Sequence, residues 1–290
     1  CMWPKDANIR LCIVIPVYGN WGDTLECLRL LAGQRERNFQ VIVSDDGSPE
    51  PAPPDLDQWE FVRYLRNPHA GFAATCNAAA REACAAGATH LFFLNNDTEF
   101  GAEFAGGWLR HIEENPDAII SPHVFWYDRP EEVWFSGGRQ SILVPFFRLT
   151  RRYAALTEVD IVCGCALLAP ARRWQEALGF DETYVTYYED FDFTLRAKAR
   201  GARVYVTADE RLNVRHKVSR SFQGTGVWRK QYRLLASRVL FIRRHYAGLA
   251  KYTCFALLCA QMMATLVLHP WELPRVGLLR AAVAEGMRGE

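Results

Sequence analysis

The chain has 290 residues and a net charge of +1, so it has room for one large domain or two small ones. Half of its residues are hydrophobic, which is enough for a substantial core and excludes an intrinsically disordered chain. The near-neutral charge gives no indication of a polyanionic partner, and we expect no nucleic acid to bind.

Charge is distributed unevenly along the sequence. Between Arg211 and Trp271 there are eleven Lys and Arg residues and no Asp or Glu, so the rest of the chain is acidic. A basic C-terminal region on an acidic body indicates contact with a negatively charged surface or ligand.

The nine cysteines are odd in number and scattered through apolar runs. We interpret five of them as small buried hydrophobes: Cys12, Cys163, Cys165, Cys254 and Cys259. The pair at 163 and 165 lacks the spacing of a zinc site. This usage predicts a reducing compartment and therefore the cytoplasm. The apolar run at 11–17 is too short for a signal peptide, in keeping with that expectation.

The first hundred residues alternate between strand-like and helix-like patterns. Four short apolar runs are typical of strands buried in a parallel sheet: residues 11–15, 39–43, 61–65 and 91–94. The first run is followed by a helical pattern, which ends at Gly33. The third run is followed by an Ala-rich helical pattern between Gly71 and Gly87. This alternation predicts a βαβ series.

Each of the four predicted strands ends in polar, turn-forming residues. The carboxyl ends of parallel strands lie at one edge of the sheet, where ligands bind in α/β proteins. The pattern therefore places five side chains around one crevice: Tyr18, Asp45, Asp46, Asn67 and Asp97. No glycine-rich phosphate loop of a common type occurs, so side chains and a metal ion would have to hold a nucleotide there.

The triplet 95–97 (Asn-Asn-Asp) directly follows the fourth strand. A carboxylate at that place can hold a hard divalent cation against a phosphate. The same residue types are common in turns and helix caps, and taken alone the triplet fits that interpretation equally well.

The second half is patterned more weakly. We predict a helix at 103–114, a strand at 119–122, an aromatic and glycine-rich loop at 134–138, and a strand at 159–169 interrupted by Gly164. Acidic residues at 189, 190 and 192 then begin a helix. Acids favour helix N-termini, but capping does not require the aromatic residues that surround these.

The C-terminal region reads as three helices. Residues 228–246 have amphipathic spacing, 252–268 carry no charge, and 274–290 form a short basic amphipathic pattern. The uncharged segment is at the low end of what spans a bilayer, for which about 20 residues are typical. We expect a helix lying in the membrane interface, and the alternative is a buried helix packed on the preceding domain.

Eight segments, in this order along residues 9–247, carry a resemblance to a known family. They are residues 13–18 (IVIPVY), 43–48 (VSDDGS), 67–73 (NPHAGFA), 94–97 (LNND), 134–138 (WFSGG), 179–182 (GFDE), 188–192 (YEDFD) and His216. The chain resembles the inverting glycosyltransferases of family two, above all their rhamnosyltransferase-like members in bacterial surface-polysaccharide assembly. The resemblance implies the GT-A fold, an α/β fold with a Rossmann-like, mostly parallel sheet flanked by helices, here followed by C-terminal amphipathic and apolar helices.

The resemblance implies a donor site for a UDP- or dTDP-linked sugar. Pro16 and Tyr18 would border the base, and Asp46, with Asp45, would hydrogen-bond a uracil or thymine ring. The full set of donor residues that it implies is Pro16, Tyr18, Asp45, Asp46, Asn67, Gly71, Asn77, Asn95 and Asn96. Ala78 stands where close relatives commonly have glycine, so it receives no role.

The resemblance also implies a metal site and a base. Asp97 would bind Mg²⁺ or Mn²⁺, with His216 as an additional ligand, although a lone histidine is more often structural. Asp190 matches the catalytic base, with Glu189 beside it. Trp134, Phe135, Gly164 and Tyr188 would contact the acceptor, a glycan or lipid-linked glycan.

We expect a catalytic domain at 1–224, with a nucleotide-binding half at 9–100 and an acceptor half at 101–224. Residues 225–290 would be a helical region that contacts the inner face of the cell membrane. Two other functions stay open. A glycoside hydrolase also uses two carboxylates but leaves the nucleotide crevice unexplained, and a binding module would lack only the base.

Overall fold

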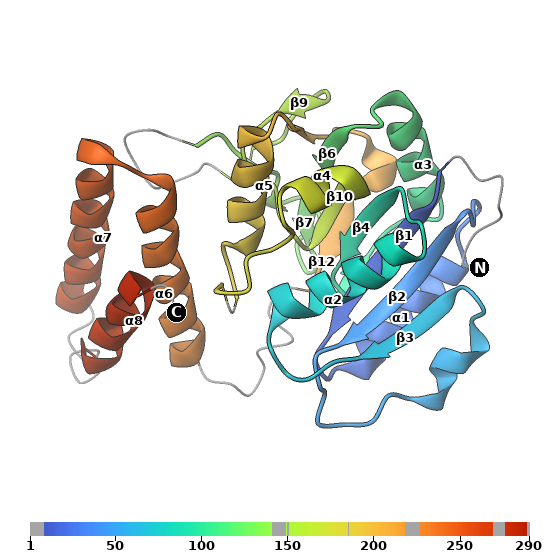
Figure 1. The fold of residues 1–290 in the computed structure, drawn as a ribbon, viewed down its shortest axis with the longest axis horizontal. Coiled ribbons are helices and arrows are strands. Elements are labelled where there is room, and N and C mark those ends of the chain that lie inside the picture. The colour runs from blue at the N-terminus through green and yellow to red at the C-terminus, as the bar shows by residue number, and fades with distance from the viewer. Residues whose placement is uncertain are drawn as a thin grey trace.

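The computed structural model describes residues 9–140, 149, 151–184, 186–217, 227–268 and 276–288. Its centre is an eight-stranded sheet in the order β3-β2-β1-β4-β10-β6-β11-β9 (Figure 1). The strands are β1 Leu11–Val17, β2 Phe39–Asp45, β3 Val62–Arg66, β4 His90–Leu94, β6 Ala118–Ser121, β9 Thr157–Glu158, β10 Ala166–Pro170 and β11 Arg203–Val206.

The four strands predicted in the first hundred residues are parallel neighbours. In the register, Val14 of β1 lies between Ile42 of β2 and Phe93 of β4. Their carboxyl ends therefore share one edge of the sheet, as predicted. Beyond β4 the direction changes, because β10 is antiparallel to both β4 and β6. The single strand predicted at 159–169 is wrong in its bounds, since a turn at residues 164–165 precedes β10.

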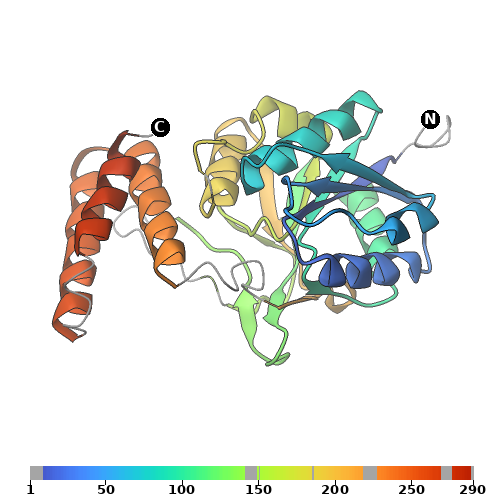
Figure 2. The same ribbon diagram turned by 90° about the horizontal axis from the view of Figure 1, so that it is seen from below.

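Helices cover both faces of this sheet (Figure 2). Alternate residues of β1 point to opposite faces, so Ile13 joins one buried cluster and Val14 the other. The first face is covered by α1 Trp21–Ala32 and α3 Phe104–Glu114. The second is covered by α2 Phe72–Ala85, α4 Ala171–Glu176 and α5 Glu189–Ala199. Two short 3₁₀ turns are η1 Pro54–Gln58 and η2 Glu210–Leu212.

A second, four-stranded sheet has the order β5-β12-β7-β8. Its strands are β5 Thr98–Glu99, β7 Val124–Trp126, β8 Val133–Phe135 and β12 Val214–His216. We predicted that residues 134–138 form a loop. This is wrong in part, because the first two of these residues end β8. Thr98, the residue after Asp97, pairs with His216 of β12, so this pairing brings His216 close to Asp97.

Three C-terminal helices stand beside the sheet domain: α6 Val227–His245, α7 Gly248–Leu268 and α8 Val276–Arg288. In both views α6 is nearest to the sheet domain and α7 is on the far side (Figures 1 and 2). The predicted inward face of α6 is confirmed, since Leu235, Val239 and Ile242 are buried against α7 and α8. The predicted domain boundary at 224–225 falls outside the described residues.

Four of the five cysteines that we interpreted as core residues are buried. Cys259, in α7, is the exception, because it is exposed. All eight cysteines in the described part of the chain are free, and the reducing compartment stays a prediction.

Candidate functional site

The loop after β2 presents Asp46 to the segment that leads into α2. The Asp46 carboxylate accepts the backbone N–H groups of Ala70 at 2.8 Å and Gly71 at 3.0 Å. Nδ1 of His69 lies 3.0 Å from its Oδ2 atom. Asp46 therefore holds the 69–71 segment against the carboxyl edge of the sheet, and its predicted contact with a nucleotide base stays a prediction.

Tyr18 follows β1 at the same edge. Its ring stacks on His69 with centroids 4.6 Å apart and planes inclined by 27°. The residue is 44% exposed, so a flat aromatic surface is accessible at the place predicted for the base. Pro16 lies inside β1, where it pairs with Ser44 of β2.

Asp45 and Asn67 use their side chains to shape the protein. The Asp45 carboxylate is fully buried and accepts hydrogen bonds from the backbone N–H of Ser48 at 2.8 Å and the hydroxyl of Tyr64 at 2.7 Å. The Asn67 amide donates to Ser44 Oγ at 2.9 Å. These hydrogen bonds account for an aspartate at 45 and an asparagine at 67 without any ligand. The predicted role of the two residues in donor binding stays a prediction.

Two further predicted donor residues are also engaged. The Asn77 amide donates to the carbonyl oxygen of Phe180 at 2.8 Å and accepts the N–H of the same residue at 3.0 Å. It thereby ties α2 to the loop before α5. Asn96 donates to Thr24 Oγ1 of α1 at 2.9 Å. Both side chains help to fix the edge where the other candidates lie.

Asp97 and His216 form a buried pair at this edge. Asp97 Oδ1 lies 3.0 Å from His216 Nε2, and the amide nitrogen of Asn95 is 3.3 Å from that same imidazole nitrogen. The structure thus brings together the two residues that the resemblance implied as metal ligands, with Asn95 beside them.

This group of side chains fits a divalent cation that is shared with a ligand. In the described part of the chain, no cluster of three or more His, Cys, Asp or Glu side chains could hold a metal alone. Asn95 Oδ1, however, is buried with no hydrogen-bond partner among the described residues. Oxygen and imidazole ligands suit Mn²⁺, and Mg²⁺ sites with one or two protein ligands are completed by substrate phosphates.

Asp190 lies in the first turn of α5 and is held by backbone N–H groups. Its Oδ2 accepts from Gly164 at 2.7 Å and its Oδ1 from Phe191 at 2.9 Å. Burial raises the pKa of Asp190 to about 6, although these backbone hydrogen bonds act in the opposite direction. The carboxylate is therefore ionised at neutral pH, yet more basic than an ordinary aspartate.

The contacts of Asp190 place it near the metal candidates. Gly164 immediately precedes Cys165, whose carbonyl oxygen accepts the N–H of Asn95 at 2.9 Å. One short segment, 164–165, thus touches both the base candidate and the triplet that contains Asp97. The two acids therefore lie near the same edge of the sheet.

Glu189 precedes Asp190 in the first turn of α5 and is also buried. Burial, together with the charge of Asp190, raises the pKa of Glu189 well above its usual value. Its Oε2 atom is buried and has no hydrogen-bond partner among the described residues. The environment of Glu189 therefore favours its neutral form more strongly than that of an exposed glutamate does.

Aromatic rings connect the two halves of this site. Trp134 meets His216 with ring centroids 4.7 Å apart, and it also contacts Phe135 at 6.1 Å. Phe135 packs on Phe191 at 5.8 Å, and Tyr188 packs on the same ring at 5.4 Å. Three of the four residues predicted to contact an acceptor, together with Phe191, therefore form a continuous aromatic band from the metal candidates to α5, in which Phe135 is buried.

Sequence reasoning missed one contact at this site. Nε2 of His245, the last residue of α6, lies 2.7 Å from Oδ1 of Asp192 in α5. The acidic residue was visible in the sequence, but no motif or spacing links it to a histidine on a different helix. Only the folded chain reveals the pair.

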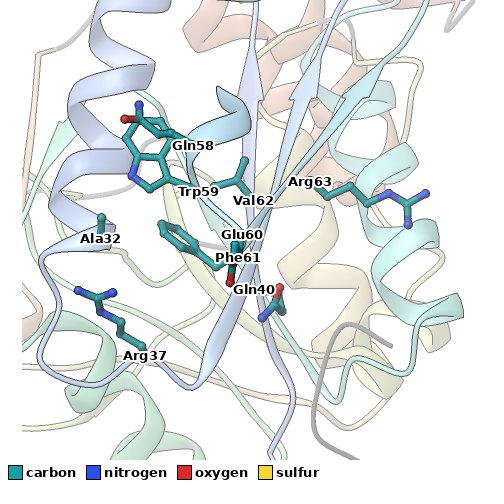
Figure 3. A pocket seen from close by; sticks show the side chains of 9 residues that line it. All are labelled: Ala32, Arg37, Gln40, Gln58, Trp59, Glu60, Phe61, Val62 and Arg63. Atoms are coloured by element: carbon teal, nitrogen blue, oxygen red, sulfur yellow. The ribbon is translucent and has the colours of Figure 1, made fainter. Parts of the chain in front are cut away.

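A hollow in the described part of the chain lies elsewhere. It has a volume of about 740 Å³ and is found near the amino ends of β2 and β3 (Figure 3). Its lining residues are Ala32, Arg37, Gln40, Gln58, Trp59, Glu60, Phe61, Val62 and Arg63. The candidate residues gather at the carboxyl ends of the strands, so we do not place the site in this hollow.

Comparison with known families decides the identity. The sequence model of the family described as Glycosyl transferase family 2 matches residues 12–170, more than half of the chain. The chain belongs to this family. It is therefore a glycosyltransferase, which removes the two alternatives left open by the sequence. The matched range contains the Asp46 loop, the 95–97 triplet and Gly164, while Asp190 and His216 follow it.

Solved structures of glycosyltransferases share the fold of this family 2 member. GalNAc-T7 with UDP, GalNAc and Mn²⁺ has 14% identity and a TM-score of 0.64, and the match covers 82% of this chain but only 48% of that one. S. aureus TarS 1-349 with UDP-GlcNAc has 16% identity and a TM-score of 0.58, covering 84% of this chain and 69% of that one.

The mannosyltransferase PcManGT from Pyrobaculum calidifontis, with GDP-Man and Mn²⁺, has 14% identity and a TM-score of 0.58. That match covers 98% of this chain and 77% of the other, so it includes the C-terminal helices. At these identities the likeness shows the fold alone. A comparison with curated protein sequences finds no match.

Proposed function

We propose that this family 2 glycosyltransferase moves a sugar from a nucleoside diphosphate to a hydroxyl of a glycan or glycolipid, with inversion at the anomeric carbon. The observation that carries the proposal is the hydrogen bond between Asp190 and Gly164, because the same short segment contacts the Asn95 backbone beside Asp97. The proposed base and the proposed metal ligand Asp97 would therefore act at one edge of the sheet.

Asp190 is the proposed general base. In the transfer, the acceptor oxygen bonds to the anomeric carbon, its proton passes to Asp190, and the bond from that carbon to the diphosphate breaks. A carboxylate has about four lone-pair positions. The N–H groups of Gly164 and Phe191 use two of them, which leaves capacity for the acceptor hydroxyl. A pKa of about 6 is well suited to a base that works near neutral pH.

Asp97 and His216 would hold a divalent cation, Mg²⁺ or Mn²⁺. When bound, such an ion neutralises the charge that develops on a departing diphosphate. Asn95, with its buried amide oxygen, lies beside the pair and would orient ligands there. Two of the structural neighbours were solved with Mn²⁺, which supports a metal in this fold.

The donor would be a UDP- or dTDP-linked sugar, with its base on the exposed ring of Tyr18. The Asp46 carboxylate at this edge would accept a hydrogen bond from a uracil or thymine ring, in addition to the bonds that it accepts from the 69–71 segment. Structural neighbours with UDP-GlcNAc and GDP-Man support nucleotide sugars as the donor class. Rhamnose remains the sugar that the sequence resemblance favours.

The acceptor would lie along the aromatic band formed by Trp134, Phe135 and Tyr188, because flat rings pack well on sugar rings. Gly164 is buried directly beside the base candidate, where it leaves room because it has no side chain. A Cβ atom there would come within 3.2 Å of Asp190, so any larger residue would crowd the base. We place the reaction in surface-polysaccharide assembly, as the resemblance implies.

Helix α7 supports a peripheral contact with the inner face of the cell membrane. Its outward side presents Leu249 and Tyr252, which are 82% and 72% exposed, and Met263 continues the same face. Residues at these spacings share one side of a helix. Among the described helices, none combines the length and the apolar composition that crossing a bilayer requires. An interfacial helix fits both observations.

A panel of UDP-, dTDP- and GDP-sugars tests the proposal. We expect one nucleotide class to bind in the presence of Mn²⁺ or Mg²⁺ and to release its nucleoside diphosphate slowly when water replaces the acceptor. Failure of every donor in the panel to bind would overturn the proposed donor class.

A further inference from the structure

One side of α6 runs along the loop that leads to the base. Ser237, Phe241 and His245 recur every four residues, so they lie on the same side of the helix. Ser237 Oγ donates to the carbonyl oxygen of Thr186 at 2.8 Å. One turn of the C-terminal region is thereby attached directly to the segment before α5.

His245 contacts the first turn of α5, the helix that carries the base candidate. Its Nε2 is 2.7 Å from Asp192 Oδ1, while Arg196 Nε donates to the other carboxylate oxygen at 2.6 Å. Asp192 is only 1% exposed. Burial alone would raise the pKa of Asp192, but the His245 hydrogen bond and the Arg196 guanidinium hold it below its usual value. An ionised carboxylate only accepts hydrogen bonds, so His245 is the donor.

The backbone just before the base is held in an unusual conformation. Tyr187 and Tyr188 have φ angles of 67° and 70°, a region that residues other than glycine rarely adopt. Such conformations persist where the surroundings hold them. The ring of Tyr188 packs on Phe241 of α6 at 5.1 Å, and Phe241 packs on His245 at 4.6 Å. Helix α6 therefore supports this segment as well.

Asp190 lies between these two supported points in the sequence. Tyr188 precedes it and Asp192 follows it, and both contact α6. Phe191, whose N–H binds the Asp190 carboxylate, also packs against the buried cluster of α6. A shift of the first turn of α5 would thus move Asp190 relative to Gly164.

We propose that His245 is a positioning residue for Asp190. By holding Asp192, it fixes the first turn of α5, which carries Asp190. Helix α6 thereby positions the base, in addition to packing against α7 and α8. This inference rests on the proposed role of Asp190 as the base.

Three substitutions separate positioning from simple destabilisation. His245→Ala removes the donor, while His245→Gln keeps a side-chain N–H that can reach Asp192. Arg243→Ala is the matched control on the same turn of α6, because Arg243 donates to backbone carbonyl groups of α8. Thermal unfolding of each variant shows whether it is folded. If His245→Ala fails to fold, His245→Leu replaces it, since leucine keeps an apolar side chain against Phe241.

The assay measures nucleoside diphosphate release from the UDP-, dTDP- or GDP-sugar that binds best, together with the affinity for that donor. We expect His245→Ala to lower kcat by about 10- to 100-fold, because small misplacements of a catalytic group have effects of this size. Donor affinity should stay within about twofold, His245→Gln should recover most of kcat, and Arg243→Ala should match the wild type. Wild-type kcat in the folded His245→Ala variant, or equal losses in the Gln and Ala variants, would overturn the proposal.

Amide hydrogen exchange gives a readout that needs no activity. In His245→Ala, exchange should become faster in residues 181–192 and stay unchanged in β1 and β4. If the wild type turns over no nucleotide sugar, the proposed function fails, yet this exchange comparison still tests the link between His245 and α5. Unchanged exchange in 181–192 would refute that link.

Discussion

Asp97 Oδ1 and His216 Nε2 lie 3.0 Å apart, although the two residues come from distant parts of the sequence. Asp97 follows the central strand β4, and His216 ends β12. The short pairing between β5 and β12, in which Thr98 meets His216, brings the two side chains together. The second sheet thus brings His216 to the carboxylate that follows the main-sheet strand β4.

Replacing Asp97 by Ala should weaken metal-dependent donor binding. Loss of an outer-shell group at a metal site typically costs about 10- to 100-fold in affinity, so loss of a ligand should cost at least about tenfold. Titration calorimetry with the preferred donor, in Mn²⁺ and then in chelator, measures this effect. Asp209→Ala is a matched control, because Asp209 faces another histidine, His111, at 3.8 Å. Equal donor affinity with and without chelator in the wild type would rule out the metal role.

Tyr18→Ala should weaken the binding of UDP or dTDP. Stacking of a base on an aromatic side chain is worth about 1–3 kcal/mol, and Tyr18→Phe keeps the ring. We therefore expect the alanine variant to lose affinity by about this amount and the phenylalanine variant to bind nearly as the wild type does. Tyr127→Ala, another exposed tyrosine of the same domain, serves as the control. A Tyr18→Ala protein that binds the nucleotide normally would contradict the stacking role.

The rate of transfer should depend on the ionisation of Asp190. Burial raises its pKa to about 6, and only the deprotonated form can accept a proton. The rate should therefore fall as the pH drops through about 6 and should be level above about pH 7. A profile of kcat against pH, at saturating donor, measures this. Full activity at about pH 5 would show that another group, or an unperturbed carboxylate, acts as the base.

Leu249→Glu should reduce binding to vesicles that contain anionic lipid. The substitution places a charge on the most exposed large apolar side chain of the α7 face, where an interfacial helix would meet the bilayer. Vesicle co-sedimentation at physiological salt measures the bound fraction. Leu156→Glu, an exposed leucine in the sheet domain, should leave binding unchanged. A wild-type chain that stays in the supernatant would end the membrane proposal.

The parts of the fold that the sequence predicted are those with strong local patterns. Residues 11–15 and 91–94 form continuous apolar runs, and their burial on both sheet faces requires such runs. The inward face of α6 was readable for a similar reason, since its spacing follows the helical period. The antiparallel direction of β10 has no such local signal, because it depends on the path of the chain through the turn at 164–165.

Side-chain roles at the site were harder to predict, because tertiary contacts decide them. Asp45, Asn67 and Asn77 have the residue types of ligand-binding positions, yet each is hydrogen-bonded to the protein itself. Strands of two or three residues, such as β5, carry too little pattern to be recognised. The role of His245 could not be predicted because it depends on a tertiary contact, since its partner Asp192 lies on another helix.

The most direct test of the account is turnover by Asp190→Asn. Asparagine keeps one oxygen that can accept the Gly164 N–H and gives up only the hydrogen bond from the Phe191 N–H. We therefore expect the fold and the donor affinity to be preserved while the base is lost. We expect kcat to fall by about 10²- to 10⁴-fold with an unchanged donor dissociation constant. Turnover close to that of the wild type in this variant would contradict the assignment of Asp190 as the base.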